Sequence, residues 1–289
     1  MQNVNKKASI RPPQKQRKPG SERKLVPLPV FDYPEKEGSE KLDGKIALIT
    51  GGDSGIGKAV AILFAKERAR LSLSYLREHA DAKETEHVIT ETYERDCLLI
   101  PGDISKERHC KKVVAKTIKK YGRIDILVNN AAIQFEEKDL TKLPSDQLLK
   151  TFETNIISMF WLTKFALPYM KKGSVIINTA SVTAYRGSGS LLDYSATKGA
   201  IVAFTRSLSA NLSKKGIRVN GVAPGPVWTP LIASGFSRTK VASHGSDVPL
   251  GRSAEPAEIA PSYLFLASDD AIYMTGQFLH PNGGEIING

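Results

Sequence analysis

A tyrosine and a lysine four residues apart carry the strongest chemical signal in the sequence. Tyr194 and Lys198 lie in the segment YSATK, at the start of a stretch with helical periodicity, and this spacing puts both side chains on one helix face. A phenol with a pKa of about 10 is a poor base at neutral pH, but a neighbouring ammonium stabilises the phenolate and lowers that pKa. The pair therefore predicts a general acid/base that exchanges a proton with a substrate oxygen.

A serine earlier in the chain has a position suited to the same chemistry. Ser181 follows the apolar run 174–179, which we interpret as a buried strand, and open α/β sheets build their sites at the carboxyl ends of strands. From there its hydroxyl would hydrogen-bond the substrate oxygen as charge develops on it. Each of these residues taken singly is compatible with the surface or the core, so the prediction depends on their combination.

The segment TGGDSGIGK at 50–58 predicts a phosphate-binding turn. It connects the first apolar run to the first amphipathic segment, where glycines permit positive φ and let backbone N–H groups approach a pyrophosphate at the start of a helix. A purely structural turn is the alternative. The predicted cofactor contacts of this turn are Gly51, Asp53, Ser54, Gly55, Ile56 and Gly57.

The residues after the second predicted strand bear on which dinucleotide binds. NAD-binding folds often place an acid there against the adenosine ribose, whereas this chain has Tyr75, Leu76 and Arg77, which we expect to contact the cofactor. Arg77 would meet the 2′-phosphate of NADP with a charge-assisted bond, although an exposed surface arginine is the alternative. Asp53 argues weakly for NAD. The sequence therefore predicts NADP or NAD, with NADP slightly favoured.

These groups need a sheet to position them. From Leu42 onward, seven short apolar runs alternate with amphipathic segments, and runs without polar alternation are typical of strands covered on both faces. Joined by right-handed crossovers, they predict an α/β fold of Rossmann type, a doubly wound parallel sheet of seven strands with helices on both faces. The runs are 45–50, 71–75, 97–100, 124–129, 174–179, 218–223 and 277–280.

Two of the segments between these runs are unusually long and apolar. Residues 144–172 and 194–215 have helical periodicity and stop at glycines 173 and 216. Their large side chains exceed what one sheet face needs, so either a helix-to-helix contact between subunits or an inward-facing core explains them. The side chains concerned are Phe160, Trp161, Phe165, Phe204 and Leu208.

The first 41 residues differ from the rest of the chain. Residues 1–24 hold eight basic side chains and one acid, so they carry +7 of the net charge of +11. Pro12-Pro13 and Pro19-Gly20 break any helix there. We therefore divide the chain into an extended basic N-terminal arm (1–41) and a single dinucleotide-binding and catalytic domain (42–289). The apolar stretch 25–34 would lie against that domain or a neighbouring subunit, and a solubilising or docked arm is favoured over a role in binding nucleic acid or membrane.

Other features of the composition narrow the class of protein. Cys97 and Cys110 are the only cysteines, too few for a disulfide framework and without the spacing of a zinc site, so we expect reduced thiols and no metal. No run approaches the ~20 apolar residues of a transmembrane helix, and no secretory signal follows the basic residues. We expect a cytoplasmic protein without a membrane or nucleic-acid partner.

Taken together, the motifs resemble those of the short-chain dehydrogenase/reductase family over residues 42–289. The resemblance implies that Tyr194 is the general acid/base, that Lys198 lowers its pKa and holds the nicotinamide ribose, and that Ser181 orients the carbonyl. It implies that Asn155 completes a proton relay through water, and that the protein is a homotetramer. The matching motifs are TGGDSGIG, NNAA at 129–132, Asn155, Ser181, the Tyr194/Lys198 pair and PGP at 224–226.

The same resemblance implies further contacts. Cofactor contacts would come from Asn129, Ala131, Asp103, Ile104, Pro224, Gly225, Val227 and Thr229, and residues 230–249 would form a mobile lid over the substrate. At the mouth of the site we expect substrate contacts from Gln134, Val182, Tyr185 and Trp228, near Phe135 and Arg186.

The basic arm and the missing acid after the second strand make the chain similar to a bacterial subgroup of stress-associated oxidoreductases. The expected reaction is hydride transfer between nicotinamide and a small carbonyl or alcohol. A non-catalytic dinucleotide sensor and an acyl-thioester ketoreductase are the alternatives.

Overall fold

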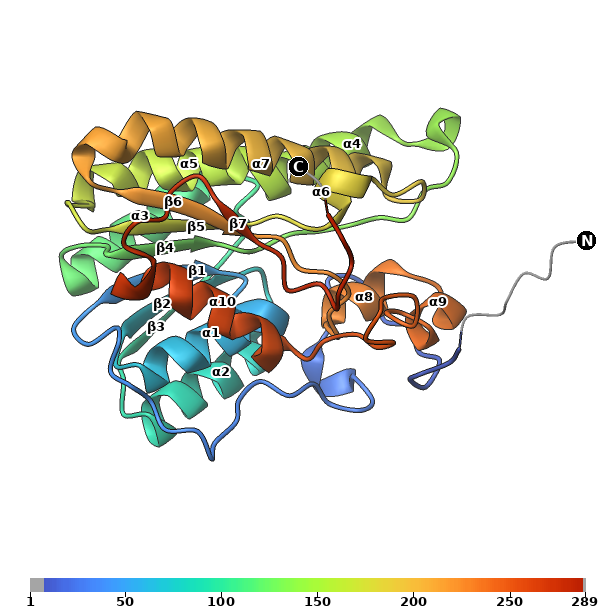
Figure 1. Cartoon of the computed structure of the whole chain (residues 1–289), viewed down its shortest axis with the longest axis horizontal. Coiled ribbons are helices and arrows are strands. Elements are labelled where there is room, and N and C mark those ends of the chain that lie inside the picture. The colour runs from blue at the N-terminus through green and yellow to red at the C-terminus, as the bar shows by residue number, and fades with distance from the viewer. Residues whose placement is uncertain (1–7, 288–289) are drawn as a thin grey trace, which may run out of the picture.

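Seven parallel strands form one sheet in the computed structural model, which describes residues 8–287. The strand order is β3-β2-β1-β4-β5-β6-β7, as expected for a doubly wound sheet. Each strand lies within two residues of its predicted bounds, so the predicted fold class is confirmed (Figure 1). The strands are β1 Ile46–Thr50, β2 Arg70–Tyr75, β3 Cys97–Pro101, β4 Ile126–Asn129, β5 Val175–Thr179, β6 Arg218–Val222 and β7 Phe278–Leu279.

Helices cover both faces of this sheet (Figure 1). One apolar cluster joins α1 and α10 to β1 and β2, and a second joins α3, α5 and α7 to the opposite face. The strands are buried between these layers, which explains why their sequences lack polar alternation. The α-helices are α1 Gly55–Lys66, α2 His79–His87, α3 Glu107–Tyr121, α4 Ser145–Phe152, α5 Ser158–Ala166, α6 Thr183–Arg186, α7 Leu192–Leu212, α8 Pro230–Gly235, α9 Arg238–Ala242 and α10 Pro256–Ala267.

The strand order reverses at β1, which pairs with β2 on one side and with β4 on the other. At such a reversal the connections leave the sheet toward opposite faces, so a crevice opens at the carboxyl ends of the two strands. The glycine turn after β1 and the NNAA segment after β4 both lie at this point. The topology thus brings two motifs from distant parts of the sequence to one edge.

The predicted helix 144–172 is interrupted. After α4 the chain forms a π-helical segment, Glu153–Ile157, then α5 and a 3₁₀ turn at Leu167–Tyr169. Single π turns within α-helices often mark functional sites. The second long segment is continuous as α7 and is followed by a 3₁₀ turn, Ser213–Lys215, which Gly216 caps with a φ of +67° that favours glycine.

The large side chains of α5 and α7 divide between the core and the surface. Trp161, Phe165 and Leu208 pack against the buried cluster beneath them. Phe160 is 52% exposed and lies 4.1 Å, between ring centroids, from Phe204. An inward-facing core thus accounts for the first three residues, and Phe204 also packs against a buried cluster, while a contact between subunits at Phe160 stays a prediction.

The described part of the arm, residues 8–41, lies along its own domain (Figure 1). Leu25 is buried in an apolar cluster with Trp228 and Phe236, and Phe31 packs against the α1/α10 cluster. Two of the basic residues counted above, Lys6 and Lys7, lie outside the described residues. For the stretch 25–34, the structure thus shows contact with the surface of the domain.

Candidate active site

A cleft of about 630 Å³ lies at the carboxyl ends of the strands, above the reversal at β1. It extends from Tyr75 and Ile104, at the ends of β2 and β3, past the glycine turn to Tyr194 on α7. Ser181, Lys198 and the turn 224–227 line its far end. Residues separated by more than 150 positions in the sequence therefore share one concave surface, which is the expected place for a ligand in this topology.

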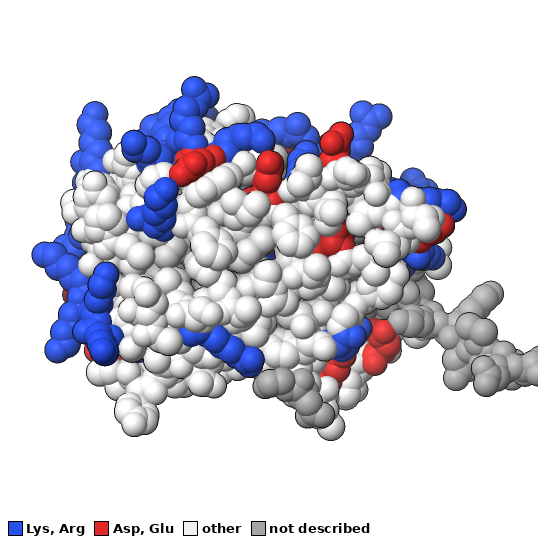
Figure 2. Space-filling view, turned by 90° about the horizontal axis from the view of Figure 1, so that it is seen from above, with Lys and Arg blue, Asp and Glu red and all other residues white. Residues whose placement is uncertain are grey.

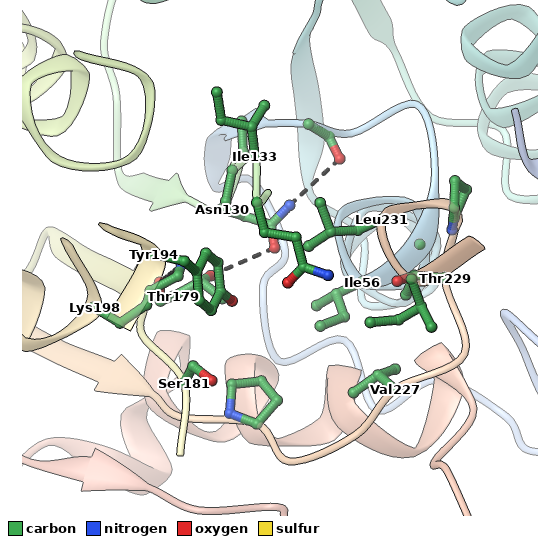
Figure 3. A pocket seen from close by; sticks show the side chains of 18 of the residues that line it. Ile56, Asn130, Ile133, Thr179, Ser181, Tyr194, Lys198, Val227, Thr229 and Leu231 are labelled. Carbon is green, nitrogen blue, oxygen red and sulfur yellow. Dashed lines mark hydrogen bonds between the residues drawn. The ribbon is translucent and has the colours of Figure 1, made fainter. Parts of the chain in front are cut away.

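Tyr194 and Lys198 lie side by side at this far end because they are one turn apart on α7. The Nζ atom of Lys198 is 5.3 Å from the centre of the Tyr194 ring and donates a 2.7 Å hydrogen bond to the carbonyl oxygen of Thr179 at the end of β5. Both side chains are buried. In Figure 3 they lie with Thr179 on one side of the pocket and Ser181 is nearby, while Ile56, Thr229 and Leu231 lie across from them.

Burial dominates the ionisation of this pair. It raises the pKa of Tyr194 to about 12, while the hydrogen bond with Ser181 acts in the opposite direction. Burial also lowers the pKa of Lys198 to about 7, because an ammonium loses its hydration there. The sequence predicted a phenol made acidic by lysine. In this structure burial dominates instead, and it keeps the phenol of Tyr194 protonated at neutral pH.

The backbone of the glycine turn has the positive φ and the tight packing that its sequence predicted. Gly51 has a φ of +66°, and a Cβ atom on Gly57 would lie 1.9 Å from the carbonyl oxygen of Gly51. Asp53, Ser54 and Ile56 line the cleft together with Gly51 and Gly55, whereas Gly57 packs behind the turn. Glycine at 57 is thus required for the folding of the turn rather than for contact with a ligand.

The cleft has the features that a dinucleotide needs. The N-terminus of α1 borders the cleft at Gly55 and Ile56, which suits a pyrophosphate, and the Gly55 N–H itself is bonded to the Glu22 carboxylate of the arm. A Cβ atom on Gly51 would lie only 3.1 Å from the Cα atom of Ala131, and the φ of +66° also favours glycine at this wall of the cradle. An adenine fits beside Tyr75, Leu76, Asp103 and Ile104, and a nicotinamide beside Pro224, Gly225, Val227 and Thr229, all of which line the cleft.

Besides Gly57, two predicted cofactor residues lie away from the cleft. Asn129 is 1% exposed, and its amide donates a 2.9 Å hydrogen bond to Asn178 on the neighbouring strand, because the last residue of β4 points into the sheet layer. Its neighbours Asn130 and Ala131 line the cleft instead. Arg77 turns outward and donates a 3.0 Å hydrogen bond to the carbonyl oxygen of Lys18 in the arm.

Asn155 is also buried outside the cleft, in the π-helical segment. Its side-chain oxygen accepts a 2.8 Å hydrogen bond from the backbone N–H of Ile133, and its amide donates to the carbonyl oxygen of Ile133 at 2.9 Å and to Thr197 at 3.2 Å. The side chain thus fixes the loop after β4 and joins it to α7. With these partners the side chain fixes the loop that borders the site, and the proton relay through water that we expected of Asn155 stays a prediction.

Of the four predicted substrate residues, Gln134 and Val182 line the cleft. Trp228 is fully buried on the other side of its loop, where its indole N–H donates a 2.9 Å hydrogen bond to the carbonyl oxygen of Pro27. Tyr185 turns away from the cleft and packs edge-on against His280, with ring centroids 4.8 Å apart. The sequence located their loops correctly, but the contacts of the two aromatic rings depend on tertiary packing.

The predicted lid contributes side chains that the sequence did not single out. Leu231 and Ile232 of α8, Phe236 just after it and Lys240 of α9 line the cleft, and Leu191 lines it from just before α7. The apolar residues within 230–249 were the one feature of the sequence from which these cleft-lining side chains could have been predicted. Pro19 and Gly20 of the arm also line the cleft, and nothing in the local sequence indicates this.

Two kinds of feature are absent from the part of the chain that the structure describes. Residues 8–287 include no cluster of three or more histidine, cysteine, aspartate or glutamate side chains that would hold a metal ion. No helix in this range is long and apolar enough to cross a membrane.

Comparison with known proteins agrees with this geometry. A family model described as enoyl-(acyl carrier protein) reductase matches residues 51–285. The chain is 56% identical to the uncharacterized oxidoreductase YhxC of Bacillus subtilis over 99% of this chain and 100% of that protein. It is 51% identical to general stress protein 39 of the same bacterium, over 94% of each chain.

A plant relative and a solved structure extend the match. The chain is 50% identical to NADPH-dependent aldehyde reductase 1, chloroplastic, of Arabidopsis thaliana, over 93% of this chain and 96% of that protein. A short chain dehydrogenase from Burkholderia cenocepacia, crystallised in complex with NADP, superposes with a TM-score of 0.79 at 27% identity, covering 84% of this chain and 98% of that one.

Fold, cleft and comparisons together define a class, that of dinucleotide-dependent oxidoreductases on a Rossmann-type sheet. The chain belongs to the short-chain dehydrogenase/reductase family, as its motifs predicted. The match to general stress protein 39 confirms the predicted similarity to stress-associated bacterial oxidoreductases.

Proposed function

We propose that this protein reduces a small aldehyde or ketone, or oxidises the corresponding alcohol, with NADP(H) as the preferred cofactor and NAD(H) as the weaker one. The observation that carries the proposal is the grouping of Tyr194, Lys198 and Ser181 at one end of a cleft whose other end is a glycine turn opening on a helix. The name of the plant relative, an NADPH-dependent aldehyde reductase, supports both the substrate class and the cofactor.

In this mechanism the dinucleotide, when bound, supplies or accepts the hydride. Tyr194 holds a proton at its phenolic oxygen and donates it to the substrate oxygen during reduction. Ser181 donates a hydrogen bond to the same oxygen and keeps the carbonyl facing the cofactor side of the cleft. In the direction of alcohol oxidation, Tyr194 accepts the proton instead.

Lys198 and Asn155 support the reaction by holding other groups in place. The hydrogen bond from Lys198 to the Thr179 carbonyl fixes its ammonium beside the tyrosine ring, from where it stabilises negative charge on the phenol and holds the nicotinamide ribose. Asn155 fixes the loop at Ile133 that borders the site. We assign cofactor contacts to the residues that the sequence predicted for this role and that line the cleft, and we add Asn130 to them.

The substrate end of the cleft suits a compact molecule with polar substituents. Val182, Leu191 and Phe236 supply an apolar wall. Arg186 and Glu285 form an ion pair of 2.6 Å at the mouth, and Lys240 pairs with Glu136 at 2.9 Å. Such a mixture fits a hydroxylated or otherwise polar aldehyde better than a long acyl chain.

A substrate panel tests this proposal. Purified protein is mixed with NADPH or NADH and a series of aldehydes, sugars and acyl thioesters, and absorbance of the reduced cofactor is followed. We expect turnover with small polar aldehydes and a higher kcat/KM with NADPH. Turnover with acyl thioesters alone would favour a ketoreductase of fatty-acid type, and binding without any turnover would favour a dinucleotide sensor.

We also propose a cytoplasmic homotetramer. The outer face of α4, α5 and α7 supports the assembly, because Leu149 is 60% exposed and Phe160 52% exposed. Figure 2 shows the face that carries α5 and α7 as uncharged over most of its area, with lysine and arginine gathered at its edges. Both cysteines are buried and free, which suits a reducing compartment. Light scattering after size exclusion would measure the mass, which should be about four times 31.5 kDa.

The division into an arm and one catalytic domain is part of the same proposal. We assign the arm no role in binding nucleic acid, since Arg11 pairs with Glu255 and Lys18 contacts Gln134 within the same chain. Titration of the protein with duplex DNA at low and moderate salt tests this, and binding that survives the higher salt would overturn the assignment.

A further inference from the structure

A short part of the arm crosses the outside of the cleft. The backbone N–H of Gln16 donates a 2.9 Å hydrogen bond to the Ala233 carbonyl in α8, and the Lys18 ammonium contacts the Gln134 carbonyl at the substrate end. On the other side, Arg77 after β2 donates to the Lys18 carbonyl at 3.0 Å. Residues 16–20 thus span from the end of β2 to the predicted lid.

The next residues fasten this segment to the phosphate-binding turn. The buried Glu22 carboxylate accepts a 2.7 Å hydrogen bond from the backbone N–H of Gly55 and a 2.8 Å hydrogen bond from the Lys58 ammonium. Asp81 in turn accepts from the backbone N–H of Glu22 at 3.0 Å. The arm is therefore anchored where α1 begins, and its position relative to the cofactor end of the cleft is fixed.

Between the arm and the end of β2 lies a second hollow of about 410 Å³, which we call the basic hollow. It shares Pro19, Gly20 and Glu78 with the cleft, so the two spaces adjoin beside Tyr75 and Leu76. Its lining includes five basic residues and one acid: Lys15, Arg17, Lys18, Lys24, Arg77 and Glu78.

The charges of the basic hollow are largely uncompensated. Among the described residues, 8–287, none of Lys15, Arg17 and Lys24 forms an ion pair, and all three are exposed. Glu78 lies 3.5 Å from the Nε atom of Arg77, so the single acid is partly neutralised by its neighbour. The Lys18 ammonium is directed to the Gln134 carbonyl, but Lys15, Arg17 and Lys24, together with Arg77, leave an excess of positive charge that suits a compact, multiply charged anion.

We propose that the basic hollow receives the 2′-phosphate of NADP, so that the N-terminal arm, and not the end of β2 alone, sets the preference for NADP over NAD. The inference rests on the proposed binding of a dinucleotide in the cleft, since only then does an adenosine ribose lie beside Leu76, where the two spaces meet. It explains how a chain with Asp53 and Glu78 near the ribose accommodates a phosphate there. Arg77 lines the hollow together with the residues of the arm.

Binding measurements on the full chain test the proposal without depending on turnover. Calorimetric titration with NADP and with NAD is performed on the wild type, on the double variant Arg17→Ala/Lys24→Ala, and on Arg23→Ala. Arg23 is the matched control, because it is exposed, lies in the same segment and does not line the hollow. Thermal melting of each variant checks that the arm remains docked.

We expect the double variant to raise the Kd for NADP roughly tenfold and to change that for NAD less than about twofold, while Arg23→Ala changes neither. Equal effects on both dinucleotides, or none, would overturn the role of the hollow while leaving the proposed function intact. A wild-type chain that binds neither dinucleotide would overturn the proposed function itself, and the inference with it.

Discussion

The ammonium of Lys198 donates a 2.7 Å hydrogen bond to the carbonyl oxygen of Thr179, and this contact ties helix α7 to the end of β5. Thr179 is held in turn, because its hydroxyl lies 2.7 Å from that of Tyr263 on α10. A lysine without this acceptor would be free to turn toward solvent. The backbone of the sheet thus sets where the charge beside Tyr194 lies.

Replacement of the lysine should remove most activity while the fold persists. In Lys198→Met the volume is similar but the charge beside the phenol is lost, so kcat should fall by about 10²–10⁴-fold. Steady-state kinetics with NADPH and an accepted aldehyde would measure this, and circular dichroism would check the fold. A kcat within a few-fold of the wild type would show that the ammonium is not needed.

The pH dependence of reduction should follow Lys198. Its pKa, lowered to about 7 by burial, means that the ammonium is present below pH 7 and is lost as the pH rises through that value. Tyr194, with its pKa raised to about 12, stays protonated as the acid throughout the accessible range. We therefore expect kcat/KM for reduction to decline above about pH 7. A rate of reduction that rises from pH 6 to 9 would contradict the requirement for a charged Lys198.

The glycine at position 57 should be indispensable for cofactor binding although it does not line the cleft. Gly57→Ala would bring a Cβ within 1.9 Å of the Gly51 carbonyl oxygen and push the turn apart. Affinity for either dinucleotide should then fall by more than tenfold in a fluorescence titration. Gly189→Ala is the control, since no atom lies within 4 Å of a Cβ there, and it should bind like the wild type.

The buried ion pair between Glu22 and Lys58 should stabilise the docked arm. In Glu22→Gln the Lys58 ammonium keeps only Glu84, whose side chain is 48% exposed, and we expect a loss of about 3 kcal/mol in the free energy of unfolding. Glu84→Gln removes the exposed partner and should cost less than about 1 kcal/mol. Chemical denaturation of both variants measures the difference. Equal losses in the free energy of unfolding would mean that the Glu22 contact stabilises the protein no more than the exposed Glu84 contact does.

Much of the fold could be predicted because its strands are buried on both faces. Runs such as 46–50 and 175–179 show no polar alternation, so their number and bounds follow from the apolar pattern, whereas their order in the sheet does not. The π-helical segment at Glu153–Ile157 could not be predicted in this way, since Asn155 is drawn out of α-helical register by partners on a distant loop.

The site was predictable where a side chain's direction follows from its element. Tyr194 and Lys198 share a face through helical spacing, and Ser181 lies at a strand end. Trp228 is different, because its indole is held by the arm's Pro27 carbonyl, and the arm has no periodicity from which its course could be read. Arg77 is directed outward by the same arm, through the Lys18 carbonyl.

The most direct test of the account is the variant Tyr194→Phe, which removes one oxygen atom and keeps the ring. Two quantities are measured on the same preparation, namely kcat with NADPH and an accepted aldehyde, and Kd for NADPH by fluorescence. If the phenol donates the proton as we propose, kcat should fall by about 10²–10⁴-fold, while Kd should change less than about threefold because Tyr194 lies away from the phosphate end of the cleft. Retained turnover in this variant would contradict the central claim that Tyr194 carries the proton.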